Sequence, residues 1–333
     1  MTGPQMRLGV IGGGAWGTAL AQTCTANGPV TLWAREPETV ADINERRENR
    51  TFLPGIALSP DLEATTDLAD LSPCDALLLV TPAQHARAAL EALGPCSKPI
   101  ILCCKGIEAG TKLLMSEVAE AVQPGAPLCV LSGPTFADEV ARGLPAAVTF
   151  SCADAALADR LIARIASPAF RPYASTDVIG AEVGGAVKNV LAIACGVAAG
   201  LDIGKNARAA IISRGFAEML RFGLAKGARE ETLAGLSGLG DLVLTCSSEA
   251  SRNMSFGKAL GEGRSAADLM ADRVTVAEGV HTAPVLVSLA RDLGVEMPIA
   301  EAVLGLVQGN LAARDALTAL MQRPLTTERS EAG

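Results

Sequence analysis

Residues 7–20 form the stretch RLGVIGGGAWGTAL, which decides the fold of the N-terminal half. Its glycines follow the pattern G-x-G-x-x-G at Gly12, Gly14 and Gly17, directly after a short apolar run and before a helical pattern over residues 16–27. Alone this pattern is weak, but between a strand and a helix it predicts a dinucleotide-binding turn. In such a turn the first glycine permits the tight bend, the second lets a pyrophosphate approach the backbone, and the third brings helix and strand together.

Further apolar runs typical of strands follow, most of them separated by Ala- and Leu-rich helical patterns. The predicted strands cover residues 7–11, 30–34, 75–80, 99–104, 127–131, 146–150 and 170–174, with a long loop over 49–62. Continuous apolar strands that alternate with helices predict a parallel sheet covered on both faces. The predicted fold class is therefore α/β, with a Rossmann-type doubly wound parallel sheet over residues 1–177.

Beyond residue 177 the strand pattern nearly disappears. The predicted helices cover residues 180–200, 207–226, 231–236, 255–260, 266–271, 278–293 and 298–306. We therefore expect an all-helical domain over residues 178–322, which carries the substrate and catalytic groups, and a polar tail over 323–333.

The composition limits the classes of function. The 333 residues are 49% hydrophobic and 19% charged, which is typical of a globular protein. The net charge of −8 argues against a nucleic-acid partner. There is no apolar leader at the N-terminus, and the longest apolar run, 190–201, is too short to span a bilayer. We expect a cytoplasmic protein without membrane insertion.

Cysteine and histidine usage argues against a metal site. The nine cysteines contain no C-x-x-C pair and are expected to be buried free thiols. The two histidines, His85 and His281, are too few for a histidine-rich metal site, and each is expected to be structural. No metal is expected.

The end of the second predicted strand bears on the choice of cofactor. Sites that prefer NAD usually carry an acidic residue here, whereas this chain has Ala34, Arg35 and Glu36. A guanidinium can hold a 2′-phosphate, so NADPH is favoured over NADH. Glu36 keeps NADH open as an alternative.

Lys188 is the other unusual feature, because it lies in a run of small apolar residues, KNVLAIACGVAAG, over 188–200. With histidine scarce, a partly buried lysine of lowered pKa is the best available proton donor. The alternative is a lysine whose amine extends along its own stem to the surface of a core helix.

Seven segments carry a resemblance that covers most of the chain, from about residue 6 to residue 310. They are VIGGGAWGTALA (10–21), CCKGIEAGT (103–111), LSGPTFADEVARGLPAAV (131–148), EVGGAVKNVLAIACGVAAGL (182–201), NARAAIISRGFAEM (206–219), LSGLGDLVLTCSSEASRN (236–253) and VAEGVHTA (276–283). In this order they resemble the bacterial NAD(P)-dependent glycerol-3-phosphate dehydrogenases. The resemblance implies reversible reduction of dihydroxyacetone phosphate to sn-glycerol 3-phosphate, the backbone of glycerophospholipids.

The resemblance also implies roles for individual positions. Lys188 matches the proton donor and acceptor, with Lys105 and Asp241 beside it. The implied substrate contacts are Lys105, Gly133, Thr135, Lys188, Asp241, Ser251, Arg252 and Asn253. The expected cofactor contacts, which include the glycine loop and Arg35 discussed above, are Gly12, Gly14, Ala15, Trp16, Gly17, Arg35, Lys105, Ala137, Arg252, Val276 and Glu278. Ala15 and Thr135 depart from the family, which commonly has serine at both positions.

Charge chemistry agrees with these roles. Arg252 and Asn253 offer a phosphate a fork of donors. Reduction of a ketone builds negative charge on its oxygen, which Lys188 can neutralise by proton transfer and Lys105 can stabilise as a cation. Asp241 would orient an ammonium group; alternatively, it caps a helix after SGLG.

Two rival functions stay open. A 3-hydroxyacid dehydrogenase also joins a Rossmann domain to helices and uses lysine and asparagine on a helix, but it would require a carboxylate substrate. A non-enzymatic NADPH sensor would bind the cofactor without oxidising it. A homodimer is among the expected assemblies, because Ala- and Gly-rich helices can self-associate.

Overall fold

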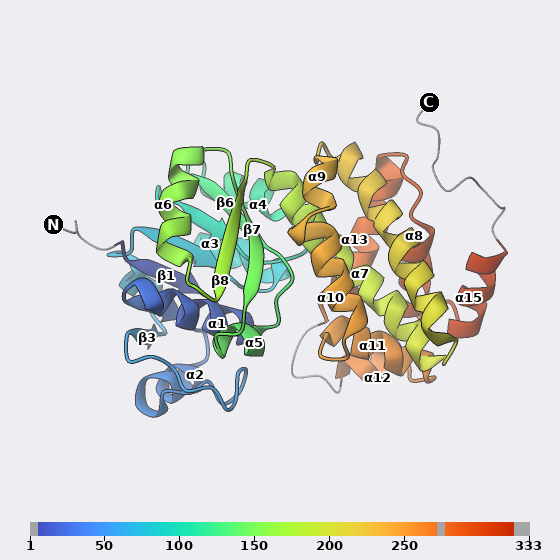
Figure 1. Cartoon of the computed structure of the whole chain (residues 1–333), viewed down its shortest axis with the longest axis horizontal. Coiled ribbons are helices and arrows are strands. Elements are labelled where there is room, and N and C mark those ends of the chain that lie inside the picture. The colour runs from blue at the N-terminus through green and yellow to red at the C-terminus, as the bar shows by residue number, and fades with distance from the viewer. Residues whose placement is uncertain (1–5, 272–276, 323–333) are drawn as a thin grey trace.

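The computed structural model describes residues 6–271 and 277–322, which form a sheet-containing half and a helical half (Figure 1). The eight strands are β1 (Leu8–Ile11), β2 (Val30–Trp33), β3 (Leu62–Thr65), β4 (Ala76–Leu79), β5 (Ile100–Leu102), β6 (Leu128–Ser132), β7 (Ala146–Cys152) and β8 (Phe170–Ser175). They form one sheet in the order β3-β2-β1-β4-β5-β6-β7-β8, and every neighbouring pair is parallel except β6 and β7. The predicted Rossmann-type α/β fold is confirmed.

The sheet differs from the prediction in two places. Strand β3 was not predicted; it is four residues long, lies at the edge of the sheet and contains the charged Glu63, so its apolar pattern is weak. Strand β7 runs antiparallel to β6, contrary to the fully parallel prediction. The connection over 133–145 makes no crossover and stays at the carboxyl end of β6, which keeps its residues beside the other strand ends.

Helices cover both faces of the sheet. In this half the helices are α1 (Ala15–Cys24), α2 (Pro37–Ala41), α3 (Ala86–Leu93), α4 (Met115–Val122), α5 (Ala137–Ala141) and α6 (Ala155–Ile165), with short turns η1 (Thr25–Asn27), η2 (Asp42–Arg46), η3 (Leu68–Leu71) and η4 (Ala83–His85). Helices α1, α5 and α6 bury their apolar side chains on one face. Helices α3 and α4, with the start of α7, bury theirs on the other.

The second half is helical, as predicted. It contains α7 (Val178–Gly200), α8 (Gly204–Ala225), α9 (Glu230–Leu233), the π-helical turn η5 (Leu236–Gly240), α10 (Asp241–Ser247), α11 (Arg252–Gly261), α12 (Ala266–Ala271), α13 (Glu278–Asp292), α14 (Pro298–Val307) and α15 (Ala313–Met321). Helices α10 and α15 were not predicted. Figure 1 shows α7 inside this half, surrounded by the others.

The apolar helix α7 is longer than the apolar run predicted from the sequence. It has 23 residues and is long and apolar enough to cross a membrane by those two criteria alone, although residues 190–201 were judged too short. Within its most apolar window, 89% of the residues are buried inside the protein. Neighbouring helices therefore cover this apolar surface.

Glycines allow those neighbours to approach α7 closely. A Cβ atom at Gly196 would lie 2.1 Å from the Met254 carbonyl oxygen, and one at Gly257 would lie 2.0 Å from the Ile193 carbonyl oxygen. On α13, a Cβ at Gly279 would lie 2.5 Å from the Asn189 carbonyl oxygen. Backbone therefore packs on backbone where α7 meets α11 and α13, which fixes the position of the first turn of each.

We predict that Gly257→Ala lowers the free energy of unfolding by about 3 kcal/mol or more, because the added methyl group meets backbone that cannot rotate away. Gly305→Ala is the matched control, since the nearest atom to a Cβ there is a Leu311 side-chain carbon at 3.1 Å. Urea unfolding of both variants measures the difference. Equal stability of the two variants would contradict the close packing of α7 and α11.

Candidate active site

Two lysines share one buried carboxylate at the junction of the two halves. Lys188, in the middle of α7, donates a hydrogen bond of 2.6 Å to Asp241 Oδ1. Lys105, just beyond β5, donates to Asp241 Oδ2 at 2.7 Å and to the Gly133 carbonyl oxygen at 3.3 Å. The side chain of Asp241 is 0% exposed, that of Lys188 8% and that of Lys105 16%. Three of the predicted catalytic and substrate residues thus form one cluster.

The environment prepares Lys188 to exchange a proton near neutral pH. The pKa of its ammonium is lowered from 10.5 to about 8, mainly by burial and also by the positive charge of Lys105. The negative charge of Asp241 opposes both effects. The amine thus does not extend to the surface, which excludes the alternative stated for this lysine.

Thr245 belongs to the cluster but was not predicted. Its hydroxyl oxygen accepts a hydrogen bond of 3.0 Å from Lys188 Nζ and donates one of 3.2 Å to Asp241 Oδ1. Thr245 and Asp241 are four residues apart on α10, so they share one helix face. The spacing was visible in the sequence, but α10 was not recognised as a helix. The Asp241 carboxylate does not cap that helix, whose N-cap is Gly240.

Two asparagines connect three helices beside this cluster. Asn253 Nδ2 donates to Asn189 Oδ1 at 3.0 Å, and Asn253 Oδ1 accepts from the Gly279 N–H at 2.9 Å. Asn189 lies next to Lys188 on α7. The buried Asn253 therefore ties the first turn of α11 to α7 and α13.

Ser251 and Arg252 begin α11. The Ser251 hydroxyl accepts a hydrogen bond of 3.3 Å from the Met254 N–H and thereby caps the helix. Arg252, beside it, is exposed and interacts electrostatically with Glu278 of α13. Of the three predicted phosphate contacts, Ser251 and Asn253 are buried and Arg252 is the exposed residue, although partial burial of its guanidinium lowers the pKa of that group.

The connection beyond β6 carries Gly133, Thr135 and Ala137. A Cβ at Gly133 would lie 2.8 Å from Val148 Cα, so the backbone here is pressed against β7. The Thr135 hydroxyl donates to the Gly133 carbonyl oxygen at 3.3 Å, the same oxygen that Lys105 contacts. Ala137 is the first residue of α5 and packs against the sheet.

The glycine loop lies at the carboxyl end of β1 and leads into α1. Gly12 has φ of 126°, which favours glycine, and a Cβ at Gly17 would lie 1.9 Å from the Gly12 carbonyl oxygen. A Cβ at Gly14, the N-cap of α1, would have nothing within 4 Å. Packing thus requires glycine at Gly12 and Gly17, whereas at Gly14 the missing side chain leaves space at a helix N-terminus, where a phosphate binds well.

Several buried polar atoms near this edge of the sheet have no hydrogen-bond partner among the described residues. Trp16 Nε1 is in the first turn of α1, Thr81 Oγ1 follows β4, and Ser132 Oγ ends β6. Glu278 Oε2 and Thr282 Oγ1 are on α13. Buried polar atoms are normally paired, so this set fits a polar ligand along the edge. With the glycine loop it suits a dinucleotide.

Val276 and Glu278 are the two cofactor contacts predicted near the start of α13, and the structure describes only Glu278. Burial raises the pKa of its carboxyl group to about 7, although the charge of Arg252 and a hydrogen bond from the Ala83 backbone lower it. Val276 lies outside the described residues. Glu278 lies close to the segment that carries Lys105, since a Cβ at Gly106 would be 3.8 Å from Glu278 Oε2.

Arg35 and Glu36 follow β2, at the end of the sheet expected to meet the adenosine ribose. The Arg35 side chain is 76% exposed, and its guanidinium forms two hydrogen bonds with Glu36 Oε1, at 2.8 and 3.0 Å. Arg35 and Glu36 therefore form an ion pair with each other just beyond the end of β2.

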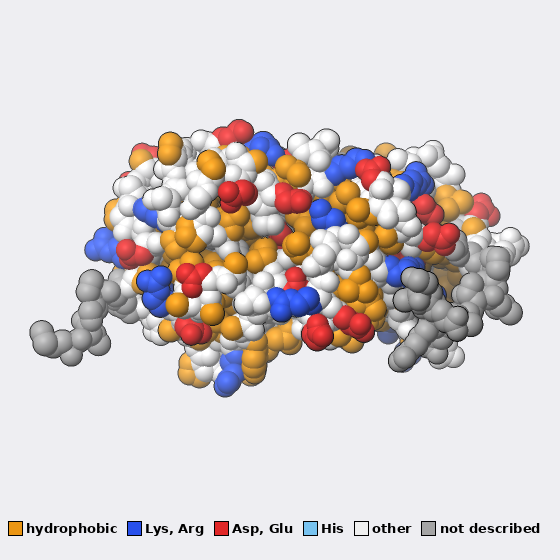
Figure 2. All heavy atoms as spheres, turned by 90° about the horizontal axis from the view of Figure 1, so that it is seen from above, with side chains coloured by type: hydrophobic (Ala, Val, Ile, Leu, Met, Phe, Trp, Pro, Cys, Tyr) orange, Lys and Arg blue, Asp and Glu red, His pale blue; other side chains and the backbone are white. Residues whose placement is uncertain are grey.

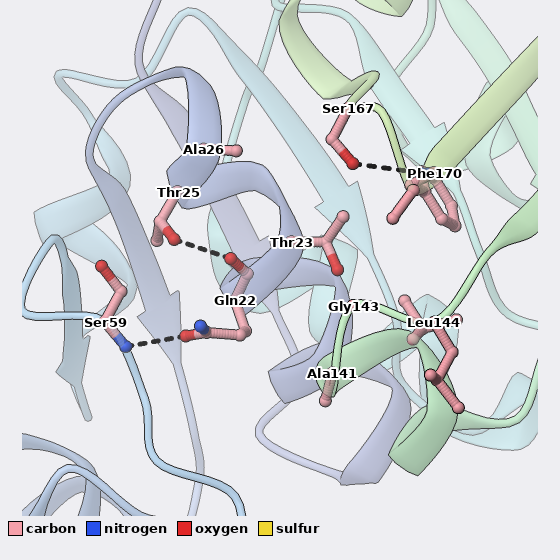
Figure 3. A pocket seen from close by; sticks show the side chains of 12 residues that line it. Gln22, Thr23, Thr25, Ala26, Ser59, Ala141, Gly143, Leu144, Ser167 and Phe170 are labelled. Atoms are coloured by element: carbon pink, nitrogen blue, oxygen red, sulfur yellow. Dashed lines mark hydrogen bonds between the residues drawn. The ribbon is translucent and has the colours of Figure 1, made fainter.

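A separate cavity of about 360 Å³ lies away from these residues, between the end of α1 and the start of β8 (Figure 3). Its walls include Gln22, Thr25 and Leu144, and Gln22 Oε1 already accepts from the Ser59 N–H. It contains none of the predicted site residues. In the described part of the chain, no group of three or more His, Cys, Asp or Glu side chains could hold a metal ion.

A dinucleotide fold that places a lysine with a near-neutral pKa at the carboxyl edge of its sheet defines the class: the protein is an oxidoreductase that uses a nicotinamide cofactor. Family models for the N-terminal and C-terminal parts of NAD-dependent glycerol-3-phosphate dehydrogenase match residues 7–158 and 177–318. The chain therefore belongs to the NAD-dependent glycerol-3-phosphate dehydrogenase family.

Individual relatives agree along the whole chain. The glycerol-3-phosphate dehydrogenase (NAD(P)+) of Novosphingobium aromaticivorans is 61% identical over 323 residues, which are 96% of this chain and 98% of that protein. That of Caulobacter vibrioides is 58% identical over 326 residues, 97% and 98% respectively. The crystal structure of glycerol-3-phosphate dehydrogenase from Coxiella burnetii superposes with a TM-score of 0.91 at 36% identity, covering 96% of this chain and 99% of that one.

A more distant structure shares the fold alone. A ketopantoate reductase family protein from Ralstonia eutropha superposes with a TM-score of 0.60 at 16% identity and covers 94% of this chain. The fold is thus shared with a protein of a different family. The fold alone therefore does not determine the reaction, which depends on the residues of the site.

Proposed function

We propose that the protein reduces dihydroxyacetone phosphate to sn-glycerol 3-phosphate reversibly with NAD(P)H, which supplies the glycerophospholipid backbone. The observation that carries this proposal is the buried Lys188–Asp241–Lys105 cluster at the carboxyl edge of the sheet. A ketone oxygen beside Lys188 would meet a proton donor and a second cation. Family membership supports the choice of substrate.

Each residue of the cluster has one proposed task. The bound cofactor supplies a hydride to the ketone carbon. The Lys188 ammonium gives a proton to the developing alkoxide, and Lys105 stabilises the negative charge before transfer. Asp241 holds both amines in place, and Thr245 fixes the direction of the Lys188 amine. In the reverse direction the neutral Lys188 amine accepts the proton.

The phosphate group is proposed to bind at the start of α11. Arg252 places a guanidinium there, near Glu278, and the capped helix N-terminus adds backbone N–H groups. Asn253 would contribute mainly by holding α11 against α7, since both ends of its amide are already hydrogen-bonded. Gly133, Thr135 and Ser251 complete the proposed substrate set.

The cofactor is proposed to extend along the edge of the sheet from Arg35 to Glu278. Its pyrophosphate would lie at Gly12, Gly14, Ala15, Trp16 and Gly17. Its nicotinamide would lie near Lys105, Ala137, Arg252, Val276 and Glu278. Ala15 lacks the hydroxyl that is common in the family, but it is the first residue of α1, so its backbone N–H is one of the donors at the helix N-terminus.

We predict opposite pH dependences for the two directions of the reaction. Reduction needs protonated Lys188, so its kcat falls as pH rises through about 8; oxidation needs the neutral amine, so its kcat rises over the same interval. Each limb changes about tenfold per pH unit beyond the pKa. Initial rates in both directions on either side of pH 8 test this, and limbs of the same sign would contradict the role of Lys188.

We propose that NADPH is preferred over NADH, because Arg35 offers a charge to a 2′-phosphate. Arg35→Ser is expected to weaken NADPH binding about tenfold and to leave NADH binding nearly unchanged. Arg46→Ser is the matched control, since Arg46 is also exposed and paired with a neighbouring acid, Asp42. Fluorescence titration with both cofactors measures the effect. An equal loss for both cofactors would contradict it.

A substrate panel separates the proposed function from its rivals. We expect NADPH oxidation with dihydroxyacetone phosphate and very little with dihydroxyacetone, because the phosphate supplies binding energy at Arg252. Turnover with 3-oxo acids instead of the phosphate ester would establish the 3-hydroxyacid dehydrogenase. Tight NADPH binding without turnover of any carbonyl compound would establish the sensor.

The remaining proposals concern the protein as a whole. We propose a dinucleotide domain over 1–177 and a substrate domain over 178–322, because β8 ends at Ser175 and α7 begins at Val178. We propose a cytoplasmic enzyme without nucleic-acid partners. On the face shown in Figure 2, the described lysine and arginine side chains are mixed with acidic ones and form no continuous basic patch, which supports the absence of a nucleic-acid partner. A homodimer is the proposed assembly, to be tested by light scattering.

A further inference from the structure

Asn49 is a fully buried polar residue that the proposed chemistry does not use. It begins the loop NRTFL (49–53), between η2 and β3, and its exposed fraction is 0%. This loop packs against the glycine loop, although the two are 36 positions apart in the sequence at Asn49 and Gly13. A buried amide without partners would be costly, so its contacts show what holds it there.

All the contacts of the Asn49 amide are local to the glycine loop and its own turn. Its Nδ2 donates to the Gly13 carbonyl oxygen at 2.8 Å and to Thr18 Oγ1 at 2.8 Å. Its Oδ1 accepts from the Phe52 N–H at 3.1 Å. Thr18 lies in the second turn of α1, and its own hydroxyl also approaches the Gly13 carbonyl oxygen, at 3.4 Å. The Asn49 amide therefore holds both the glycine loop, at Gly13, and the start of α1, at Thr18.

The bond to the Gly13 carbonyl determines where the next N–H points. In a planar trans peptide the carbonyl oxygen of Gly13 and the N–H of Gly14 point in opposite directions. Because Asn49 holds this carbonyl oxygen, the Gly14 N–H points away from Asn49. The space beside Gly14 is open, since a Cβ there would have nothing within 4 Å. The glycine pair could otherwise rotate this peptide at little cost, since glycine is conformationally permissive.

On its other side, Gly13 packs against Ala34, the residue that follows β2. A Cβ at Gly13 would lie 2.4 Å from the Cβ of Ala34, the residue before Arg35. The loop is thus clamped between Ala34 and Asn49. Neither contact involves the group that distinguishes NADPH from NADH.

We propose that Asn49 is a positioning residue for the cofactor: it locks the Gly13–Gly14 peptide with its N–H aimed at the pyrophosphate. NADH and NADPH share the pyrophosphate, so Asn49 raises affinity for both by the same factor. It does not touch the ketone substrate or Lys188. Its effect on the reaction therefore appears in cofactor binding and not in kcat at saturating cofactor.

Asn49→Asp is the direct test, because it keeps the shape and replaces the donor to the Gly13 carbonyl with an acceptor. The dissociation constants of NADH and NADPH, measured by fluorescence titration, are expected to rise together, by roughly 10-fold to 100-fold. At saturating NADPH, kcat and the KM for dihydroxyacetone phosphate are expected to stay within about twofold. The binding readout stands even if another ketone is the substrate.

Asn44→Asp is the matched control. The Asn44 amide also makes two backbone hydrogen bonds, with the Ala64 carbonyl and the Ala64 N–H at 2.8 Å each, but it does not contact the glycine loop. It is expected to lower the Tm without changing either dissociation constant. A lower Tm for Asn49→Asp with unchanged cofactor binding would reduce Asn49 to a structural residue and overturn the proposal.

Two further variants decide the matter if Asn49→Asp does not fold. Asn49→Ser removes the reach to Gly13 without adding a charge, and Thr18→Val removes the hydroxyl that Asn49 contacts. Both are expected to weaken NADH and NADPH equally, by about threefold to tenfold. Unchanged binding of both cofactors, or weaker binding of NADPH alone, would overturn the proposal.

Discussion

Lys188→Met is expected to lower kcat for reduction of dihydroxyacetone phosphate by about 10³-fold, within the range that positioned proton transfer contributes to enzymes. Methionine fills the same space in α7 but cannot carry a proton. NADPH affinity is expected to stay within about threefold, because the cofactor edge is built from other residues. Steady-state kinetics and fluorescence titration measure the two effects.

Lys258→Met is the matched control for this change. Lys258 lies on α11 and pairs with Glu249 at 2.8 Å on the surface. Its substitution removes one lysine from the helical half without touching the cluster. A Lys188→Met enzyme that retained more than a tenth of the wild-type kcat would show that another group, or water, supplies the proton.

Asp241→Asn is expected to have the second large effect, on both stability and pH dependence. It leaves the buried Lys188 ammonium and the partly buried Lys105 ammonium without their shared counter-ion, which costs about 3–5 kcal/mol of folding free energy unless one of them loses its proton. The Asp241 carboxylate raises the pKa of Lys188, so loss of that charge is expected to lower the pKa of Lys188 from about 8 to a smaller value. The falling limb of the reduction reaction then moves to lower pH, and kcat at pH 7 falls.

Glu218→Gln separates this effect from a general loss of stability. Glu218 is also a buried carboxylate, and it accepts hydrogen bonds from the Ile299 and Ala300 N–H groups at the start of α14. Its substitution is expected to lower the Tm and to leave the pH profile in place. An Asp241→Asn enzyme whose pH profile matched wild type would contradict the coupling between Asp241 and Lys188.

The sequence predicted those features that depend on local patterns. Gly12 and Gly17 were recognisable because a tight turn between strand and helix requires glycine there. Lys188 was recognisable because its neighbours on the helix are small or apolar. The helical half was predicted from length and apolar content, and seven of the eight strands from their apolar runs.

The features that were missed depend on contacts between distant segments. Asp241 was assigned to the site from the family resemblance, but its contacts with Lys188, 53 positions away, and Lys105, 136 positions away, are not encoded by any local pattern. Thr245 was missed because α10 is only seven residues long. Asn49 was missed because it lies in a loop, and its partners are on another element. The antiparallel β7 was missed because apolar runs do not reveal strand direction.

The proposed reaction depends on proton transfer from the buried Lys188 to a phosphorylated ketone. Stopped-flow oxidation of bound NADPH in a single turnover tests it most directly, because that rate reports the chemical step rather than product release. With dihydroxyacetone phosphate at saturation, the account predicts a rate that falls by about 10³-fold in Lys188→Met. It also predicts a large fall when the phosphate is absent. A Lys188→Met rate within threefold of wild type would contradict the account.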